Sequence, residues 1–150
     1  MQNGGRWLLC GALLTGAASL LHLCIIFGGP DWYRFFGAGE RMARLSARGS
    51  AYPTFVTAGI ASVLALWALY GLSGAGVIRR LPLLRPALLL VAVVYLARGA
   101  LGIPLVLFAE NPYADELKGR MTFMVVSSLV CVFLGFCYAF GAARVWHRRI

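Results

Sequence analysis

Long apolar runs alternate with short polar segments along the chain. Four runs, at about 7–28, 53–73, 83–109 and 121–143, are each long enough to cross a bilayer core of about 30 Å. Because backbone polar groups in lipid must be satisfied within the segment, each run predicts a transmembrane helix. Short connections make consecutive helices antiparallel neighbours. The pattern therefore predicts an all-α integral membrane protein, with one domain over 1–150 built as an up-down four-helix bundle.

The segment 31–48, between the first two runs, has an amphipathic pattern. On a helical projection, its apolar side chains Trp32, Phe35, Phe36, Met42 and Ala43 fall in one arc, opposite Arg34, Glu40, Arg41, Arg44 and Arg48. This predicts an amphipathic helix in the plane of the membrane interface. Gly37 and Gly39 weaken such a helix, which leaves two short turns as an alternative. The segment either covers the outer end of the bundle or binds lipid or a partner, and the sequence leaves both roles open.

The composition favours a membrane protein over the soluble classes. Hydrophobic residues make up 61% of the chain and charged residues 13%, and the mean hydropathy is +0.80. A soluble domain carries about 25% charged residues, so an ordinary soluble globule is excluded, as are a disordered tail and a disulfide-rich secreted module. The net charge of +9 suggests loops held at an anionic membrane surface, and no nucleic-acid partner is predicted.

The distribution of charge predicts an orientation. The termini and the second loop carry Arg6, Arg79, Arg80, Arg85, Arg144, Arg148 and Arg149, and no acidic residue. The opposite side carries Arg34, Arg41, Arg44, Arg48, Lys118 and Arg120, and also Asp31, Glu40, Glu110, Asp115 and Glu116. Because the basic residues of the first group lie closer to the span ends, both termini are predicted to be cytoplasmic, in a plasma (inner) membrane. The first run is predicted to be a retained span.

Two ionisable side chains, Arg98 and His22, lie inside the predicted spans. Such residues are costly in a membrane and are functional hypotheses by default. Arg98 lies about 14 residues, or ~21 Å, beyond the start of the third run, and His22 lies similarly far into the first run. The two side chains are therefore expected at one depth, in the outer half of the membrane. Tyr95 shares a helix face with Arg98.

The Arg98 charge predicts an anionic ligand. No span contains a carboxylate, and an unpaired buried cation favours an anion. We expect an anionic lipid or a lipophilic small molecule in an outer-leaflet pocket. Its predicted lining is Arg98, His22, Tyr95, Ser62, Ser127, Ser128 and Glu110. Glu110 alternatively pairs with Arg98, and Gly99, Gly102 and Pro104 are expected to loosen the helix beside it. There are two structural alternatives to a ligand pocket. Arg98 only snorkels toward the membrane surface, and the hydroxyl side chains only form hydrogen bonds between helices.

The predicted role is binding without catalysis, with membrane lipids or a lipophilic anion as partner. One alternative is a membrane subunit or accessory protein of a larger complex. Another is a small membrane enzyme that uses His22 as proton carrier and Arg98 as anion clamp. No metal or cofactor is predicted, since His147, the other histidine, is expected on the opposite half of the membrane. The four cysteines form no CxxC pair.

Small residues also suggest close contacts between helices. Ala12 and Gly16 in the first run, and Gly135 and Ala139 in the fourth, have the spacing that lets helix backbones approach. A four-helix unit of this size also presents much lipid-facing surface, so a homodimer or a larger membrane complex is a further predicted partner.

Overall fold

The computed structural model of the protein describes residues 3–147 and contains helices and no strands within them. The long helices are α1 (Asn3–Phe35), α3 (Tyr52–Ala75), α4 (Leu84–Phe108) and α6 (Met121–His147), and the short ones are α2 (Glu40–Ala47) and α5 (Pro112–Lys118). All four long helices are long and apolar enough to cross a membrane. The four predicted spans are thereby confirmed as helices of membrane-spanning length and composition. Arg148 and Arg149, which contribute to the predicted orientation, lie outside the described residues.

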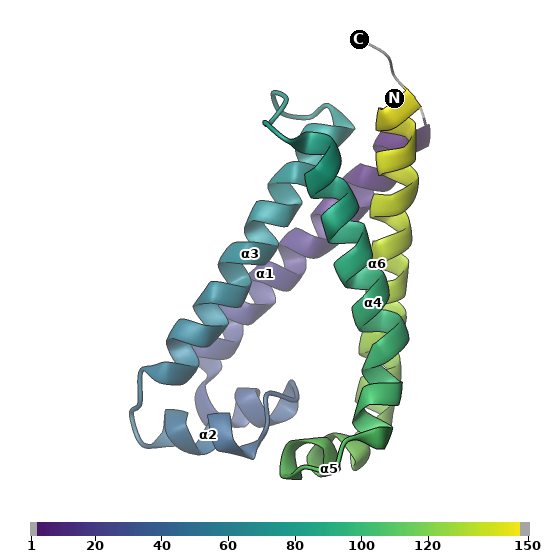
Figure 1. Ribbon diagram of the computed structural model, residues 1–150. Coiled ribbons are helices and arrows are strands. Elements are labelled where there is room, and N and C mark those ends of the chain that lie inside the picture. Colours follow the sequence, from purple (N-terminus) through teal and green to yellow (C-terminus); the bar gives the residue numbers. More distant parts are fainter. Residues whose placement is uncertain (1–2, 148–150) are drawn as a thin grey trace.

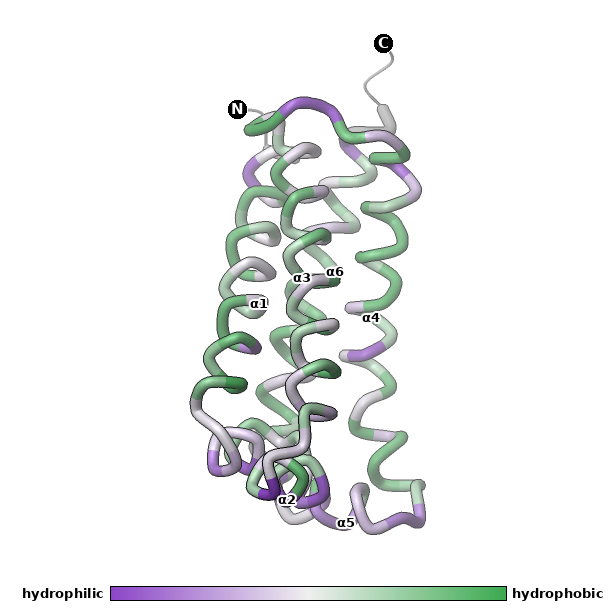
Figure 2. The backbone as a smooth tube through the Cα atoms, turned by 90° about the vertical axis from the view of Figure 1, so that its left-hand side faces the viewer, coloured by the Kyte–Doolittle hydropathy of each residue, from purple (hydrophilic) through white to green (hydrophobic). Residues whose placement is uncertain are grey.

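The long helices form two pairs, α1 with α3 and α4 with α6, which meet at one end and separate toward the other (Figure 1). The chain ends near the meeting point, called the termini end, and α2 and α5 lie at the opposite, loop end. α1 packs on α3 and α6 and lies diagonally across from α4. Figure 2 shows hydrophobic residues along the long helices and hydrophilic ones concentrated at the two ends.

A single core joins the two pairs in the half of the bundle toward the termini end. This termini-end core consists of Leu8, Leu84, Leu88, Val91, Ala92, Tyr95, Leu134, Tyr138 and Ala142. Within it, the Tyr95 hydroxyl lies 3.2 Å from Thr15 Oγ1, and the Tyr138 hydroxyl lies 3.3 Å from the same oxygen. The Tyr138 hydroxyl also donates to the Trp67 carbonyl at 3.1 Å. These contacts connect side chains or backbone of all four long helices.

The half of the bundle toward the loop end has two separate small cores. One consists of Ile25, Tyr33 and Ala43, from α1 and α2, and the other of Val106, Leu117 and Met124, from α4, α5 and α6. Each small core belongs to one helix pair and its connecting helix. The apolar packing that joins the pairs is therefore concentrated at the termini end.

The segment 31–48 is not the single helix predicted for it. α1 passes through a kink at Gly29 (φ 70°, ψ −155°), and the chain turns at Gly37 (φ 74°) and Gly39 (φ 92°) before α2 begins. These positive φ values suit glycine and interrupt a helix, so the alternative of two short segments is the one observed. The two segments lie on either side of the turn at 36–39.

The predicted apolar arc of this segment also needs correction. Tyr33, which the projection left out of the arc, is buried against Ile25 and Ala43. Trp32 and Phe35 are exposed instead. The break at the glycines rotates α2 relative to residues 31–35, so one helical projection does not apply to both.

The small residues singled out from the sequence make contacts within the chain. Ala12 lies against Gly71 of α3, where an added Cβ on Gly71 would lie 2.8 Å from the Ala12 Cβ. Gly135 lies against Leu96 of α4, where an added Cβ would lie 2.6 Å from Leu96 Cγ. These positions therefore bring α1 close to α3 and α4 close to α6.

Candidate functional site

Arg98 lies on α4, on the side of the helix that faces the other pair. Val91, Tyr95 and Gly102 are buried at positions i−7, i−3 and i+4 relative to Arg98, so all of them share one helix face with it. Arg98 itself is exposed. Its guanidinium makes no hydrogen bond or ion pair with any group that the structure describes.

The guanidinium lies against Gly102 and close to Ser128 of α6. A Cβ added to Gly102 would overlap Arg98 Nη1, and it would lie 3.3 Å from Ser128 Oγ. Ser128 is buried, and its hydroxyl has no hydrogen-bond partner among the described residues. An unpaired cation and an unpartnered hydroxyl therefore lie next to each other on the face of α4 and α6. Both are hydrogen-bond donors suited to an anionic oxygen.

Close packing of α4 on α6 holds these two groups together. A Cβ on Gly99 would lie 2.9 Å from the Ser128 carbonyl oxygen and 2.9 Å from the Val132 backbone nitrogen. The absence of a side chain at Gly99 is what allows α6 to approach so closely. α4 continues through Pro104 to Phe108, and loosening or kinking of this helix by Gly99, Gly102 and Pro104 stays a prediction. Gly99 allows close contact between α4 and α6, and Gly102 leaves room for the guanidinium.

His22 lies at the same depth as the guanidinium but on the other helix pair. Thr15 and Tyr95 are hydrogen-bonded, and His22 and Gly102 each lie seven residues further toward the loop end. His22 Nδ1 is 2.7 Å from the Ala18 carbonyl oxygen of its own helix. Because a carbonyl only accepts, Nδ1 donates this bond, and in the neutral ring the other nitrogen is an acceptor. A neutral His22 therefore offers an anion no donor.

Tyr95 belongs to the termini-end core and is not grouped with the guanidinium. Its hydroxyl bonds to Thr15, and its ring contacts Trp67 edge-to-face, with ring centroids 5.4 Å apart. The shared helix face expected from the sequence is present. The side chain, however, is used to join helices.

The other predicted lining residues are also occupied locally or lie apart from Arg98. Ser62 is exposed, and its hydroxyl donates to the Ala58 carbonyl at 2.8 Å. The Ser127 hydroxyl donates to the Met124 carbonyl at 3.1 Å. Glu110 is exposed and forms no described ion pair with Arg98. Of the predicted lining, the structure thus brings together Arg98 and Ser128.

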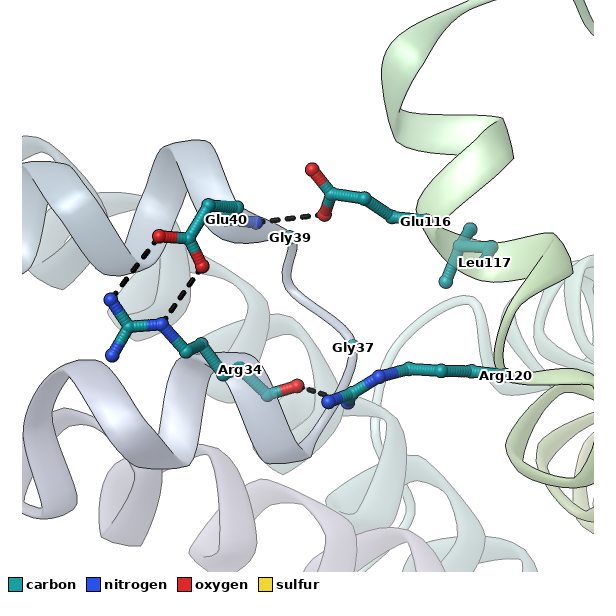
Figure 3. Close-up of a pocket in the computed structure, with 7 residues that line it drawn as sticks. All are labelled: Arg34, Gly37, Gly39, Glu40, Glu116, Leu117 and Arg120. Carbon is teal, nitrogen blue, oxygen red and sulfur yellow. Dashed lines mark hydrogen bonds and ion pairs between the residues drawn. The ribbon is translucent and has the colours of Figure 1, made fainter.

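A second polar cluster joins the two helix pairs at the loop end (Figure 3). Glu116 Oε2 accepts from the Glu40 backbone N–H at 2.8 Å, as Figure 3 shows. The Tyr113 hydroxyl donates to the Gly37 carbonyl at 2.9 Å. Arg120 Nη1 donates to the carbonyls of Arg34 and Phe35, the latter at 3.0 Å. We call this set, in which Tyr113, Glu116 and Arg120 bond to the backbone of residues 34–40, the loop-end latch.

The loop-end latch is supported by ion pairs on its α2 side. Arg34 Nε lies 2.8 Å from Glu40 Oε2, Arg34 Nη1 lies 2.9 Å from Asp31, and Arg44 Nε lies 3.1 Å from Glu40 Oε1. The bond from Arg34 and then that from Arg44 lower the pKa of the Glu40 carboxyl to about 2. Arg41 and Arg48 are exposed. Of the residues predicted for a membrane interface, Arg34 and Arg44 thus make ion pairs, whereas Trp32 and Phe35 are exposed and Phe36 is half-buried.

Two pockets flank the loop-end latch. One, of about 350 Å³, is lined by Arg34, Gly37, Gly39, Glu40, Glu116, Leu117 and Arg120. The other, of about 430 Å³, is lined by Ala38, Gly39, Glu40, Arg41, Met42, Tyr52, Asn111, Pro112, Tyr113 and Glu116. Arg98 and Ser128 line neither of them. Partial burial raises the pKa of the Tyr113 hydroxyl, and the positive charge of Arg98 opposes this shift.

Sequence analysis missed the latch and the helix that carries most of it. Helix α5 begins after Asn111, whose side chain accepts from the Ala114 backbone N–H at 2.8 Å, and Pro112 occupies its first turn. An asparagine cap followed by proline is a recognised helix start, so a signal for this helix is present in the sequence. The backbone acceptors of Gly37, Arg34 and Phe35 carry no signal in the sequence.

Within the described part of the chain, no group of three or more His, Cys, Asp or Glu side chains gathers to hold a metal ion. Comparison of the chain with protein-family models, curated proteins and solved structures finds no match. The functional argument therefore rests on the geometry of Arg98 and Ser128 and on the arrangement of the helices around them.

Proposed function

We propose that this protein binds an amphiphile with an anionic headgroup, a carboxylate or a phosphate, through Arg98 and Ser128. The observation that carries the proposal is an unpaired guanidinium in the middle of an apolar helix, beside a buried hydroxyl with no partner. Placing an arginine at the centre of a membrane helix costs roughly 2.5–3.5 kcal/mol on insertion scales. An anion that pairs with Arg98 offsets this cost and satisfies Ser128 as well.

The proposed setting is a plasma (inner) membrane crossed four times in an up-down order. Supporting this, the termini lie at one end of the bundle, and α2 and α5 lie at the other (Figure 1). Both termini are proposed to be cytoplasmic, with the loop end on the outer side. Residues 31–35 and α2 are proposed to lie at the outer interface, because Trp32 and Phe35 are exposed and so are the basic residues Arg41 and Arg48.

The depth of Arg98 suits a lipid-like ligand. The guanidinium lies at the level of Gly102, six residues from the end of α4 at Phe108. At 1.5 Å per residue this is about 9 Å below the loop end of the helix. A headgroup therefore needs to descend only part of one leaflet to reach Arg98, while its chain stays among apolar side chains.

The proposed role is binding without catalysis. The enzyme alternative requires His22 to act as a proton carrier beside Arg98. In the structure, His22 Nδ1 bonds to its own helix, and the ring lies on the other helix pair. These observations favour a site that holds an anion over one that transfers a proton.

The test uses oleate and lysophosphatidate as carboxylate and phosphate probes. The protein, purified in mild detergent, is incubated with each probe and examined by native mass spectrometry. We expect Arg98→Ala to reduce retention about tenfold or more, because hydrogen bonds to charged groups contribute roughly 1.5–3 kcal/mol. Arg80→Ala, which removes the same charge from an exposed loop position, is the matched control and should retain the probe. Equal retention by Arg98→Ala and the unmodified protein contradicts the proposal.

Two further variants separate position from charge. Gly102→Ala keeps the charge of Arg98 but displaces its guanidinium, since the added Cβ overlaps Nη1. We expect weaker retention of both probes. Ser128→Ala should weaken retention less, because a neutral donor is lost. The alternative role, a subunit of a larger complex, gives a different result: a stoichiometric protein companion remains bound after extraction from native membranes.

A further inference from the structure

The helix pairs are joined by different means at their two ends. At the termini end, the joined core includes Tyr95, Tyr138 and Leu88. At the loop end, the pairs are joined by the side-chain-to-backbone bonds of the loop-end latch. Between these ends, α3 and α4 make no described hydrogen bond or ring contact beyond Trp67 and Tyr95.

In this middle region, α3 and α4 both carry exposed apolar side chains. On α3, Val63, Ile60 and Val56 continue the helix face of Trp67 at positions i−4, i−7 and i−11. On α4, Leu101 and Leu105 follow Arg98 at i+3 and i+7. Ile60 is 44% exposed and Leu105 is 64% exposed. We call this set, Val56, Ile60, Val63, Leu101 and Leu105, the α3–α4 side.

The latch end carries several charged side chains, and the positive charge of Arg98 acts on its Tyr113 hydroxyl. The 350 Å³ pocket is lined mainly by charged side chains and glycines, whereas the 430 Å³ pocket also has apolar lining from Ala38, Met42 and Pro112. Neither pocket includes Arg98 or Ser128. A water-soluble anion entering at this end would first have to break the bonds of Tyr113, Glu116 and Arg120. An anion that enters across the α3–α4 side breaks no hydrogen bond that the structure describes.

Resting on the proposed function, we infer that the ligand is a membrane-resident amphiphile with an acyl chain, and that it reaches Arg98 sideways from the bilayer between α3 and α4. Its anionic headgroup pairs with the guanidinium and the Ser128 hydroxyl. Its chain lies on the α3–α4 side, where the exposed apolar side chains match hydrocarbon. Charge complementarity at Arg98 selects this amphiphile over the zwitterionic lipids that contact the same surface.

Two crosslinked variants distinguish the routes. In a background with the four native cysteines replaced by alanine, Ile60→Cys with Leu101→Cys is bridged by a bismaleimide to close the α3–α4 side. Arg41→Cys with Pro112→Cys, two residues that line the 430 Å³ pocket, is bridged in the same way to lock the loop end. Each double variant treated with the monofunctional reagent N-ethylmaleimide is its own control. Both proteins are reconstituted in phosphatidylcholine vesicles, oleate is added, and retained oleate is measured by native mass spectrometry.

We expect the α3–α4 crosslink to reduce the initial rate of oleate uptake about tenfold or more, and the loop-end crosslink to leave it within about twofold. Acetate, which has the same carboxylate without a chain, should not compete. Uptake blocked by the loop-end crosslink, by both crosslinks or by neither overturns the sideways route. Competition by acetate overturns the ligand class. Failure of the proposed function itself is recognised separately, because uncrosslinked Arg98→Ala then retains oleate as well as Arg80→Ala does.

Discussion

The two ends of the bundle join the same helix pairs in contrasting ways. At the termini end, Tyr138 is fully buried, stacks on Tyr95 and bonds to both Thr15 and the Trp67 carbonyl. At the loop end, the exposed side chains of Tyr113 in α5 and of Arg120, just before α6, bond to the backbone of a glycine-containing turn. Buried packing is lost only when the helices separate, whereas exposed hydrogen bonds exchange with water at a small net cost of about 0.5–1.5 kcal/mol each.

This difference teaches where the protein is rigid and where it can open. The termini-end core fixes the angle between the pairs, and the loop-end latch restrains their free ends. Gly29, Gly37 and Gly39, all with positive φ, interrupt the helical path of the chain on the α1 side of the latch. Arg98 lies between the two regions, on the part of α4 that the core no longer covers.

The largest effect is expected from removing the side chain that centres the termini-end core. Tyr138→Ala deletes a fully buried ring and should lower the free energy of unfolding by roughly 3–5 kcal/mol, as aromatic-to-alanine changes do in packed cores. Tyr138→Phe removes only the hydroxyl bonds and should cost about 0.6 kcal/mol, typical of hydrogen bonds between membrane helices. Thermal unfolding in detergent, followed by circular dichroism, measures both. Equal losses for the two variants would place the stability in the hydroxyl and not in the packing.

The next effect concerns the contact that holds Arg98 beside Ser128. Gly99→Ala places a Cβ 2.9 Å from two backbone atoms of α6, which cannot move aside as a flexible side chain can. We expect a loss of about 1–3 kcal/mol, as for overpacked cores. Gly59→Ala is the matched control, because nothing lies within 4 Å of its added Cβ. There the better helix former should stabilise by up to about 1 kcal/mol. Loss of stability in Gly59→Ala would contradict the described packing.

A smaller effect on stability, but a larger one on geometry, is expected at the latch. Tyr113→Phe combined with Arg120→Gln removes bonds between the pairs and should cost about 1 kcal/mol or less per bond. Spin labels on α2 and α5 should report a longer and broader distance distribution by pulsed electron paramagnetic resonance. Lys118→Gln is the control, since Lys118 bonds within its own pair, to Ala109 and Asp115. An unchanged distribution in the double variant would show that the latch does not restrain the pairs.

The smallest effect is expected from acid. Because Arg34 and Arg44 lower the pKa of Glu40 from 4.5 to about 2, the ionised carboxyl stabilises the folded turn at pH above 4.5. This contribution falls as the pH drops from 4.5 toward 2, since the unfolded chain takes up the proton first. Hydrogen exchange of residues 36–40, corrected for the intrinsic rate, should rise across this range. Glu40→Gln should remove the dependence, and a dependence that persists in that variant would assign the titration to another group.

The spans and the approximate depth of Arg98 could be predicted from the sequence, because both depend on the length of apolar runs. Hydropathy gives the position of a residue along a helix. The break in segment 31–48 was predicted only as an alternative. Helix propensity indicates that Gly37 weakens a helix there, but it does not indicate whether tertiary packing overrides this effect. The burial of Tyr33 depends on the rotation introduced at Gly29, which no projection of a single helix contains.

The candidate site could be predicted only in part for a related reason. Arg98 is identified by its charge, but its neighbours depend on which faces of α4 and α6 meet, and that is decided by Gly99 and its contact with Ser128. Depth alone grouped His22 and Tyr95 with Arg98. The depth of a residue in the membrane does not tell whether its helix packs on α4 or lies across the bundle from it. His22 was therefore grouped with Arg98, although the two residues lie on different helix pairs.

The central claim is that the Arg98 guanidinium holds the headgroup of an anionic amphiphile. Solid-state nuclear magnetic resonance tests it most directly, with ¹⁵N-labelled arginine and oleate labelled with ¹³C at its carboxyl carbon, in reconstituted protein. The account predicts a guanidinium-to-carboxyl contact that disappears in Arg98→Ala and remains in Arg80→Ala. Bound oleate whose carboxyl contacts an arginine that is still present in Arg98→Ala would contradict it.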